Sequence, residues 1–98
     1  MEDKLWVFQA NAVSGGDGRY ERGRRHPLLI FSANPDRDRA EAEILARLAE
    51  RGWTAVNISR SGEVELNNIG DDGYLRAAAD DALEGGCGFV VYETPMDN

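Results

Sequence analysis

The sequence predicts an α+β fold, a two-layer sandwich of one β-sheet and two helices. The stretch from Pro27 to Ile58 carries, in order, an apolar strand pattern, a helical pattern and an alternating strand pattern. A second helical pattern then stands between two further strand patterns. A chain of 98 residues buries enough surface to fold alone. We therefore expect one domain over residues 1–98.

The stretch from Pro27 to Ile58 has clear element boundaries. Residues 28–33 (LLIFSA) are apolar on both parities, which is typical of a strand buried on both faces. Asn34-Pro35-Asp36 predicts a helix start, because Asn caps helices, Pro fits the first helical position and an acid suits the positive end of the helix dipole. Asp38 and Glu41 resemble a capping box, so a start at Asp38 is the alternative. The apolar stripe of this helix consists of Ala40, Ile44, Leu45, Leu48 and Ala49. Gly52 ends the helix, and residues 53–59 alternate as a strand.

The remaining elements follow weaker patterns. Arg60-Ser61-Gly62-Glu63 predicts a tight turn, after which residues 63–66 return as a short strand along the previous one. A second helix ends at Gly85-Gly86. Its buried stripe consists of Leu75, Ala78, Ala79, Ala82 and Leu83. Residues 88–94 (GFVVYET) form the last strand, and residues 4–12 form an additional N-terminal strand.

The element order over residues 27–94 is βαββαβ, the ferredoxin-like arrangement. We expect both helices to cover one face of an antiparallel sheet, with residues 28–33 central and the other face open. Two placements of the N-terminal strand remain open. It either covers the edge of the last strand, or it pairs with residues 27–33 as a long hairpin and displaces the ferredoxin-like order.

Charge indicates which partners are suitable. The net charge is −7, and residues 27–98 carry six basic against fourteen acidic groups. This acidic body repels nucleic acid and anionic membranes, so a protein partner or self-association is expected. There is no apolar run of membrane-spanning length and no signal-peptide pattern, and one cysteine excludes an internal disulfide framework. We expect a cytoplasmic protein.

The sequence lacks the residue patterns of several common catalytic, metal-binding and phosphate-binding sites. Cys87 and His26 fall at opposite ends of the predicted sheet, too far apart for a catalytic pair. One cysteine and one histidine cannot build a zinc site, and the acidic pairs do not continue into a calcium loop. The segment from Ser14 to Gly18 matches no phosphate-binding loop. The sequence indicates no catalytic residue, no metal and no cofactor.

The most distinctive local feature is a loop over residues 13–26 that is rich in glycine and arginine. Its candidate binding residues are Arg19, Tyr20, Arg22, Arg24, Arg25 and His26. Arginine pairs with carboxylate or phosphate and stacks on aromatic rings, so this loop could hold an anionic ligand or partner. The alternative is that the arginines only form ion pairs with the acidic body.

Three functions remain as hypotheses. The first is a non-catalytic binding or regulatory module that acts through the open sheet face or the arginine loop, with homodimerisation through that face as one form. The second is an acidic inhibitor or immunity-type protein that masks a basic partner. It requires one continuous surface of Glu63, Glu65, Asp80, Asp81 and Glu84. The third is a small enzyme with a pocket between the open face and the 13–26 loop. Its candidate groups are Tyr20, Arg24, His26 and Tyr92.

Overall fold

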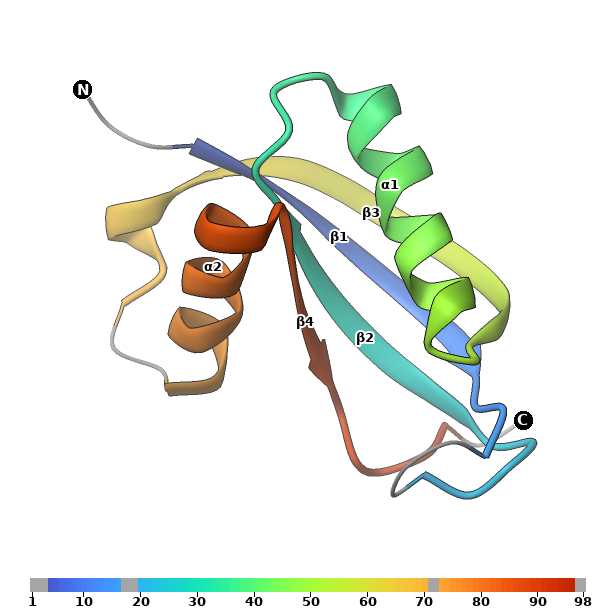
Figure 1. Ribbon diagram of the computed structural model, residues 1–98. Coiled ribbons are helices and arrows are strands. Elements are labelled where there is room, and N and C mark those ends of the chain that lie inside the picture. Colours follow the sequence, from blue (N-terminus) through green and yellow to red (C-terminus); the bar gives the residue numbers. More distant parts are fainter. Residues whose placement is uncertain (1–3, 17–19, 71–72, 97–98) are drawn as a thin grey trace.

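A long antiparallel hairpin, β1 (Lys4–Val13) and β2 (Arg25–Ser32), forms the centre of a four-stranded sheet. The computed structural model describes residues 4–16, 20–70 and 73–96. The later elements are α1 (Arg37–Glu50), β3 (Thr54–Glu65), the 3-10 helix η1 (Leu66–Asn68), α2 (Gly73–Gly85) and β4 (Cys87–Val91). The strand order is β3-β1-β2-β4, and all neighbouring strands are antiparallel (Figure 1). The predicted α+β fold is confirmed at this level.

The ferredoxin-like order predicted for residues 27–94 is absent, because β1 stands between β2 and β3. β1 pairs with β2 from Trp6 opposite Ser32 to Val13 opposite Arg25. The chain therefore adopts the alternative in which the N-terminal strand forms a long hairpin. The start of the connecting loop continues the hairpin, since the Ser14 amide donates to the Arg24 carbonyl at 2.8 Å. Partners close in sequence lose little entropy on pairing, which favours this hairpin.

The predicted turn at residues 60–63 is also wrong, because β3 runs unbroken through it. A β-bulge at Ser59 explains the sequence pattern. β1 pairs Gln9 with Arg60 and Ala10 with Ile58, so Ser59 is the extra residue on β3. Even-numbered side chains before the bulge, such as Ile58, therefore face one side of the sheet. Even-numbered side chains after the bulge, such as Val64, face the other side. The alternation of apolar and polar residues is interrupted because the extra residue shifts it by one position, and not because one strand ends and another begins.

The two helices cover opposite faces of the sheet, so the prediction of two layers with one open face is wrong. α1 packs on Phe8 and Ile30, whereas α2 packs on Leu5 and Phe31, their neighbours of opposite parity. Figure 1 shows the two helices on either side of the strands. The arrangement explains why residues 28–33 are apolar on both parities, since β2 is buried on both faces.

α1 begins two residues later than the cap at Asn34 predicts, since Asp36 is its N-cap, and it ends where predicted. The carboxylate of Asp36 caps the helix and accepts hydrogen bonds from the amides of Asp38 and Arg39 at 2.9 and 3.1 Å. Gly52 adopts a φ of 86°, a conformation that glycine reaches without strain, immediately after the last turn. The core stripe consists of Ala40, Ile44 and Leu48. Leu45 is exposed, so the buried stripe is narrower than the sequence predicts.

Candidate functional site

Helix α2 covers only part of its face of the sheet. It sits directly on β4 at Gly88, where an added Cβ would lie 1.7 Å from the carbonyl oxygen of Ala78. Its buried side chains, Ala78, Ala79 and Ala82, are small, so the helix backbone approaches the strands closely. This seating covers Phe31 on the neighbouring strand. The part of the sheet further from α2 remains uncovered on this face.

One row of side chains crosses all four strands at the border of this uncovered part, with Leu29 and Val90 packed against the α2 cluster. Arg60 on β3 lies opposite Gln9, Gln9 lies opposite Leu29, and Leu29 lies opposite Val90. Val7 lies on one side of this row and Tyr92 on the other. We call this region the open sheet surface; it consists of Val7, Gln9, Leu29, Arg60, Val90 and Tyr92. Gln9, Arg60 and Tyr92 are exposed, and the other three are half-buried.

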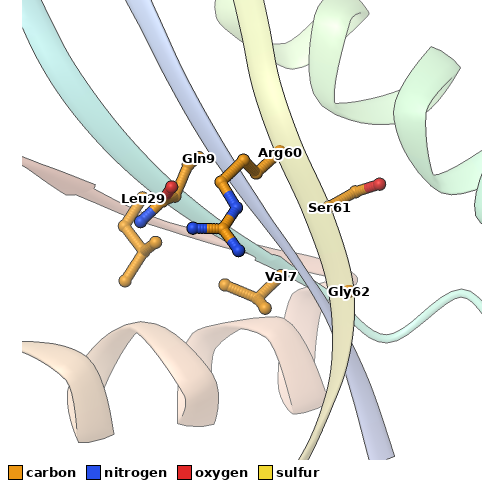
Figure 2. A pocket seen from close by; sticks show the side chains of 6 residues that line it. All are labelled: Val7, Gln9, Leu29, Arg60, Ser61 and Gly62. Atoms are coloured by element: carbon orange, nitrogen blue, oxygen red, sulfur yellow. The ribbon is translucent and has the colours of Figure 1, made fainter.

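Three adjoining hollows run along the open sheet surface. The first has a volume of about 270 Å³ (Figure 2). Its lining residues are Val7, Gln9, Leu29, Arg60, Ser61 and Gly62. The second, of about 220 Å³, shares Gln9 and Leu29 with the first and extends to Tyr92 and Met96. The third, of about 300 Å³, shares Tyr92 with the second and reaches Tyr74 on α2. Their shared residues make them one shallow, mostly apolar depression.

Arg60 supplies the only full charge among the six residues of the open sheet surface. Figure 2 shows its side chain extending over β1 toward Gln9 and Leu29, whereas Ser61 points to the opposite side, toward α1. Within residues 4–16, 20–70 and 73–96, the Arg60 guanidinium has no ion pair and no hydrogen bond. The bulge at Ser59, whose hydroxyl donates to the Gln9 carbonyl at 3.1 Å, sets this orientation. An arginine in such a position is suited to bind a carboxylate.

The described arginines of the 13–26 loop have separate partners. Arg24 lies 3.7 Å from the carboxylate of Glu21, inside the loop itself. Arg25 lies in β2 and donates to the Asn11 side chain and to the carbonyl of Ala55. None of these partners is an acid of residues 27–98, so among the described residues neither of these two arginines forms an ion pair with the acidic body.

Arg22 and Arg19 are the other two arginines of the loop. The stem of Arg22 packs on Gly16, where an added Cβ would lie 2.9 Å from the arginine Cβ. Arg19 lies outside the described residues. Within the described part of the loop, each arginine has its own local surroundings.

The structure does bring Tyr20 and His26 together, and it adds Trp53. The ring centroids are 5.0 Å apart for Tyr20 and His26, and 6.0 Å apart for His26 and Trp53. His26 is 2% exposed, and its Nδ1 lies 2.9 Å from the Tyr92 carbonyl. A carbonyl only accepts, so Nδ1 donates this hydrogen bond, and Nε2 has no partner among the described residues. This cluster packs the loop against the turn between α1 and β3.

Cys87 is not placed for catalysis. It begins β4 opposite Ser32, whereas His26 lies beside Tyr92, beyond the other end of β4. The predicted separation of the two residues is therefore present. The Cys87 thiol donates to Oε1 of Glu43 at 3.0 Å. Burial, together with the Glu43 carboxylate, raises the pKa of Cys87 to about 12, so the reactive thiolate is scarce at neutral pH.

The described residues contain no group of three or more histidine, cysteine, aspartate or glutamate side chains arranged to hold a metal ion. In the same residues, no helix has the length and apolar character needed to cross a membrane. Comparisons of the chain with protein-family models, with curated proteins and with solved structures gave no match.

Sequence reasoning placed Arg60 and Gly62 in a turn and therefore missed their part in the open sheet surface. One signal could have corrected this. The segment contains neither proline nor an Asn-Gly or Asp-Gly pair, the strongest markers of a two-residue hairpin turn. A continuous strand with a bulge fits the same residues.

Proposed function

We propose that this protein is a non-catalytic protein-binding module and that the open sheet surface is its binding surface. The observation that carries the proposal is the row Arg60–Gln9–Leu29–Val90, which α2 covers only in part and whose one charge has no partner among the described residues. Apolar side chains around a charge that is ready to pair are typical of protein interfaces, where arginine and aromatic residues are enriched.

The shape of the surface favours a macromolecular partner over a small molecule. Ligand pockets commonly have volumes of roughly 300–1,000 Å³ and enclose most of the ligand. The three hollows here measure about 270, 220 and 300 Å³ and adjoin one another along the sheet. A partner that lies along the sheet can fill all three. Tyr92, which is 47% exposed, and Tyr74, which is 82% exposed, add apolar area at one end.

The other hypotheses receive less support from the geometry. The described part of the 13–26 loop packs on the α1–β3 turn, where Gly15 lies directly against the carbonyl of Gly52, so it does not roof the open sheet surface as an enzyme lid would. For an acidic inhibitor, Glu63 lies opposite Trp6 on the α1 face, whereas Asp80 is on α2. The acids therefore do not gather on one side of the sheet.

Capture from an extract of the cells that make the protein tests the proposal. Two variants alter the surface: Gln9→Arg adds bulk at its centre, and Tyr92→Ser removes its most exposed apolar side chain. Two matched controls, Ala46→Arg and Leu45→Ser, make the same kinds of change on exposed positions of α1. We expect quantitative mass spectrometry to find a protein that is retained by the wild type and both controls and lost from both surface variants.

Equal recovery of every captured protein by all four variants would contradict the proposal. Circular dichroism of each variant checks that the fold is unchanged, so that loss of a partner reports on the surface.

A further inference from the structure

The outer edge of β3 is free along a regular stretch. β3 is the last strand on its side of the sheet, and its pairing with β1 is uninterrupted from Arg60 opposite Gln9 to Glu65 opposite Lys4. Within the described residues, no backbone hydrogen bond outside the sheet involves residues 60–65. Such an edge presents a row of amides and carbonyls that another strand can pair with. The bulge at Ser59 limits this regular edge to about six residues.

Gly62 leaves a gap in the side chains at this edge. After the bulge, Arg60, Gly62 and Val64 face the α2 side of the sheet. An added Cβ on Gly62 would meet no atom within 4 Å, and its φ is not positive. The backbone therefore does not require glycine here. Its effect is to leave the first hollow open toward the edge, with Val7 and Leu29 behind it.

We propose that the edge of β3 binds an extended peptide segment of a partner protein as a fifth strand of the sheet. An apolar side chain of the peptide passes over Gly62 into the first hollow, and a carboxylate two residues away pairs with Arg60. The main-chain hydrogen bonds to β3 supply affinity, and the hollow and Arg60 supply specificity. This inference rests on the proposed function and names the class of partner for the same surface.

For a segment that pairs antiparallel to β3, as all neighbouring strands of this sheet do, the register gives the sequence pattern. In an antiparallel pair, directly opposed residues share a face, and successive residues on that face are two apart. Residues opposite Val64, Gly62 and Arg60 therefore follow the pattern apolar–x–apolar–x–acidic from the N-terminus of the segment. The residue between the two apolar positions lies opposite Glu63, on the α1 face, and a lysine suits it. Because the chain has a net charge of −7, an acidic residue of the segment is attracted to the positive charge of Arg60 rather than to the protein as a whole.

A designed peptide tests this directly. The probe is a fluorescein-labelled peptide with the core Val-Lys-Phe-Thr-Glu, and binding is measured by fluorescence anisotropy. We expect saturable binding to the wild type and weakening of about tenfold, equal to about 1.4 kcal/mol, for Gly62→Val, whose side chain fills the gap. Arg60→Ala weakens binding by a similar factor, and Arg39→Ala, an exposed arginine on α1, leaves it unchanged. Replacing the peptide phenylalanine with alanine has the same effect as Gly62→Val.

Two further measurements test the ion pair with Arg60 and the main-chain hydrogen bonds to β3 separately. Arg60→Glu should bind a peptide that ends in lysine better than one that ends in glutamate. Of two peptides N-methylated at alternate residues, strand addition predicts that only the one whose methyl groups face β3 loses binding. Gly62→Val should melt at or above the wild-type temperature, since a β-branched residue suits a strand, so its loss of binding is not a loss of fold.

No binding of the wild type to the peptide would overturn the strand-addition proposal, and so would equal binding by Gly62→Val. Concentration-dependent dimerisation in sedimentation equilibrium, abolished by Gly62→Val, would assign the edge to a second copy and overturn it also. If Gln9→Arg and Tyr92→Ser still lose a captured partner in any of these cases, the open sheet surface keeps its function.

Discussion

At the scale of single residues, the buried polar groups have structural explanations. His26 lies between Tyr20 and Trp53 and bonds to the Tyr92 carbonyl, which ties the C-terminal end of β4 to the start of β2. Cys87 bonds to Glu43 at the other end of β4. Cys87 and His26, the side chains of this sequence best suited to nucleophilic and acid–base chemistry, do not contact each other. Each instead forms a hydrogen bond that links two elements of the fold.

The state of Cys87 gives a direct prediction. A thiol whose pKa is raised from 9.0 to about 12 carries about a thousandfold less thiolate at pH 8 than an unfolded cysteine. We expect iodoacetamide to modify the native protein far more slowly than the urea-unfolded protein, as followed by mass spectrometry. Because the folded pKa is raised, Cys87 also disfavours the native state as pH rises from about 9 to about 12.

The control for this prediction is Glu43→Gln. Removing the carboxylate removes one cause of the raised pKa, so native Cys87 should react faster in this variant. A native wild-type thiol that reacts as fast as the unfolded one would refute the assignment.

Sequence reasoning at this scale worked where the cause is local. It predicted a helix start within Asn34-Pro35-Asp36, although Asp36 rather than Asn34 is the cap, and the stop at Gly52, since capping depends on neighbours in the chain. It also predicted the separation of Cys87 and His26, because their places at strand ends are set by the order of the elements. It did not predict the cluster of Tyr20, His26 and Trp53, which forms only when the loop meets the α1–β3 turn.

At the scale of elements, the seating of α2 on β4 decides how much of the sheet is covered. Small residues on α2 and Gly88 on β4 bring their backbones into contact. A larger pair would lift the helix and change the area left open. The position of α2 is thus coupled to the shape of the candidate binding surface.

Gly88→Ala tests this seating. The added Cβ would lie 1.7 Å from the Ala78 carbonyl oxygen, so the helix must shift. We expect the free energy of unfolding in urea to fall by about 3 kcal/mol, the upper range for overpacking a core. Gly62→Ala is the matched control, since its Cβ would meet no atom within 4 Å, and it should not lower stability. Equal stability of the two variants would contradict the close contact between α2 and β4.

The elements also show why the hairpin prediction at residues 60–63 is wrong. Val56 and Ile58 face α1, whereas Val64 faces α2, because Ser59 adds one residue to the strand. In the sequence, these apolar residues are separated by polar ones and glycine, which resembles a turn. A bulge is stabilised by pairing with β1, a partner about fifty residues away, so the local sequence indicates only that the strongest turn markers are missing.

At the scale of the whole molecule, the pairing of β1 determines the architecture. Inserting β1 between β2 and β3 makes β2 and β3 parallel, joined through α1 by a crossover, and it moves β3 to the edge. The sequence left this pairing open, since apolar alternation in residues 4–12 suits either placement. The helix faces follow from the same choice: α1 connects parallel strands on one face, and α2 returns across the other. The open sheet surface is therefore a product of topology.

Our central proposal is that a partner protein binds residues 60–65 at the edge of the sheet, together with Gln9, Leu29 and Tyr92 beside them. Site-specific photocrosslinking in the cells that make the protein tests it most directly. A photoreactive phenylalanine analogue replaces Gln9 in one protein and Ala46, on exposed α1, in the other. We expect a discrete protein adduct from position 9 that is absent at position 46. The same adducts from both positions, or none from position 9, would contradict it.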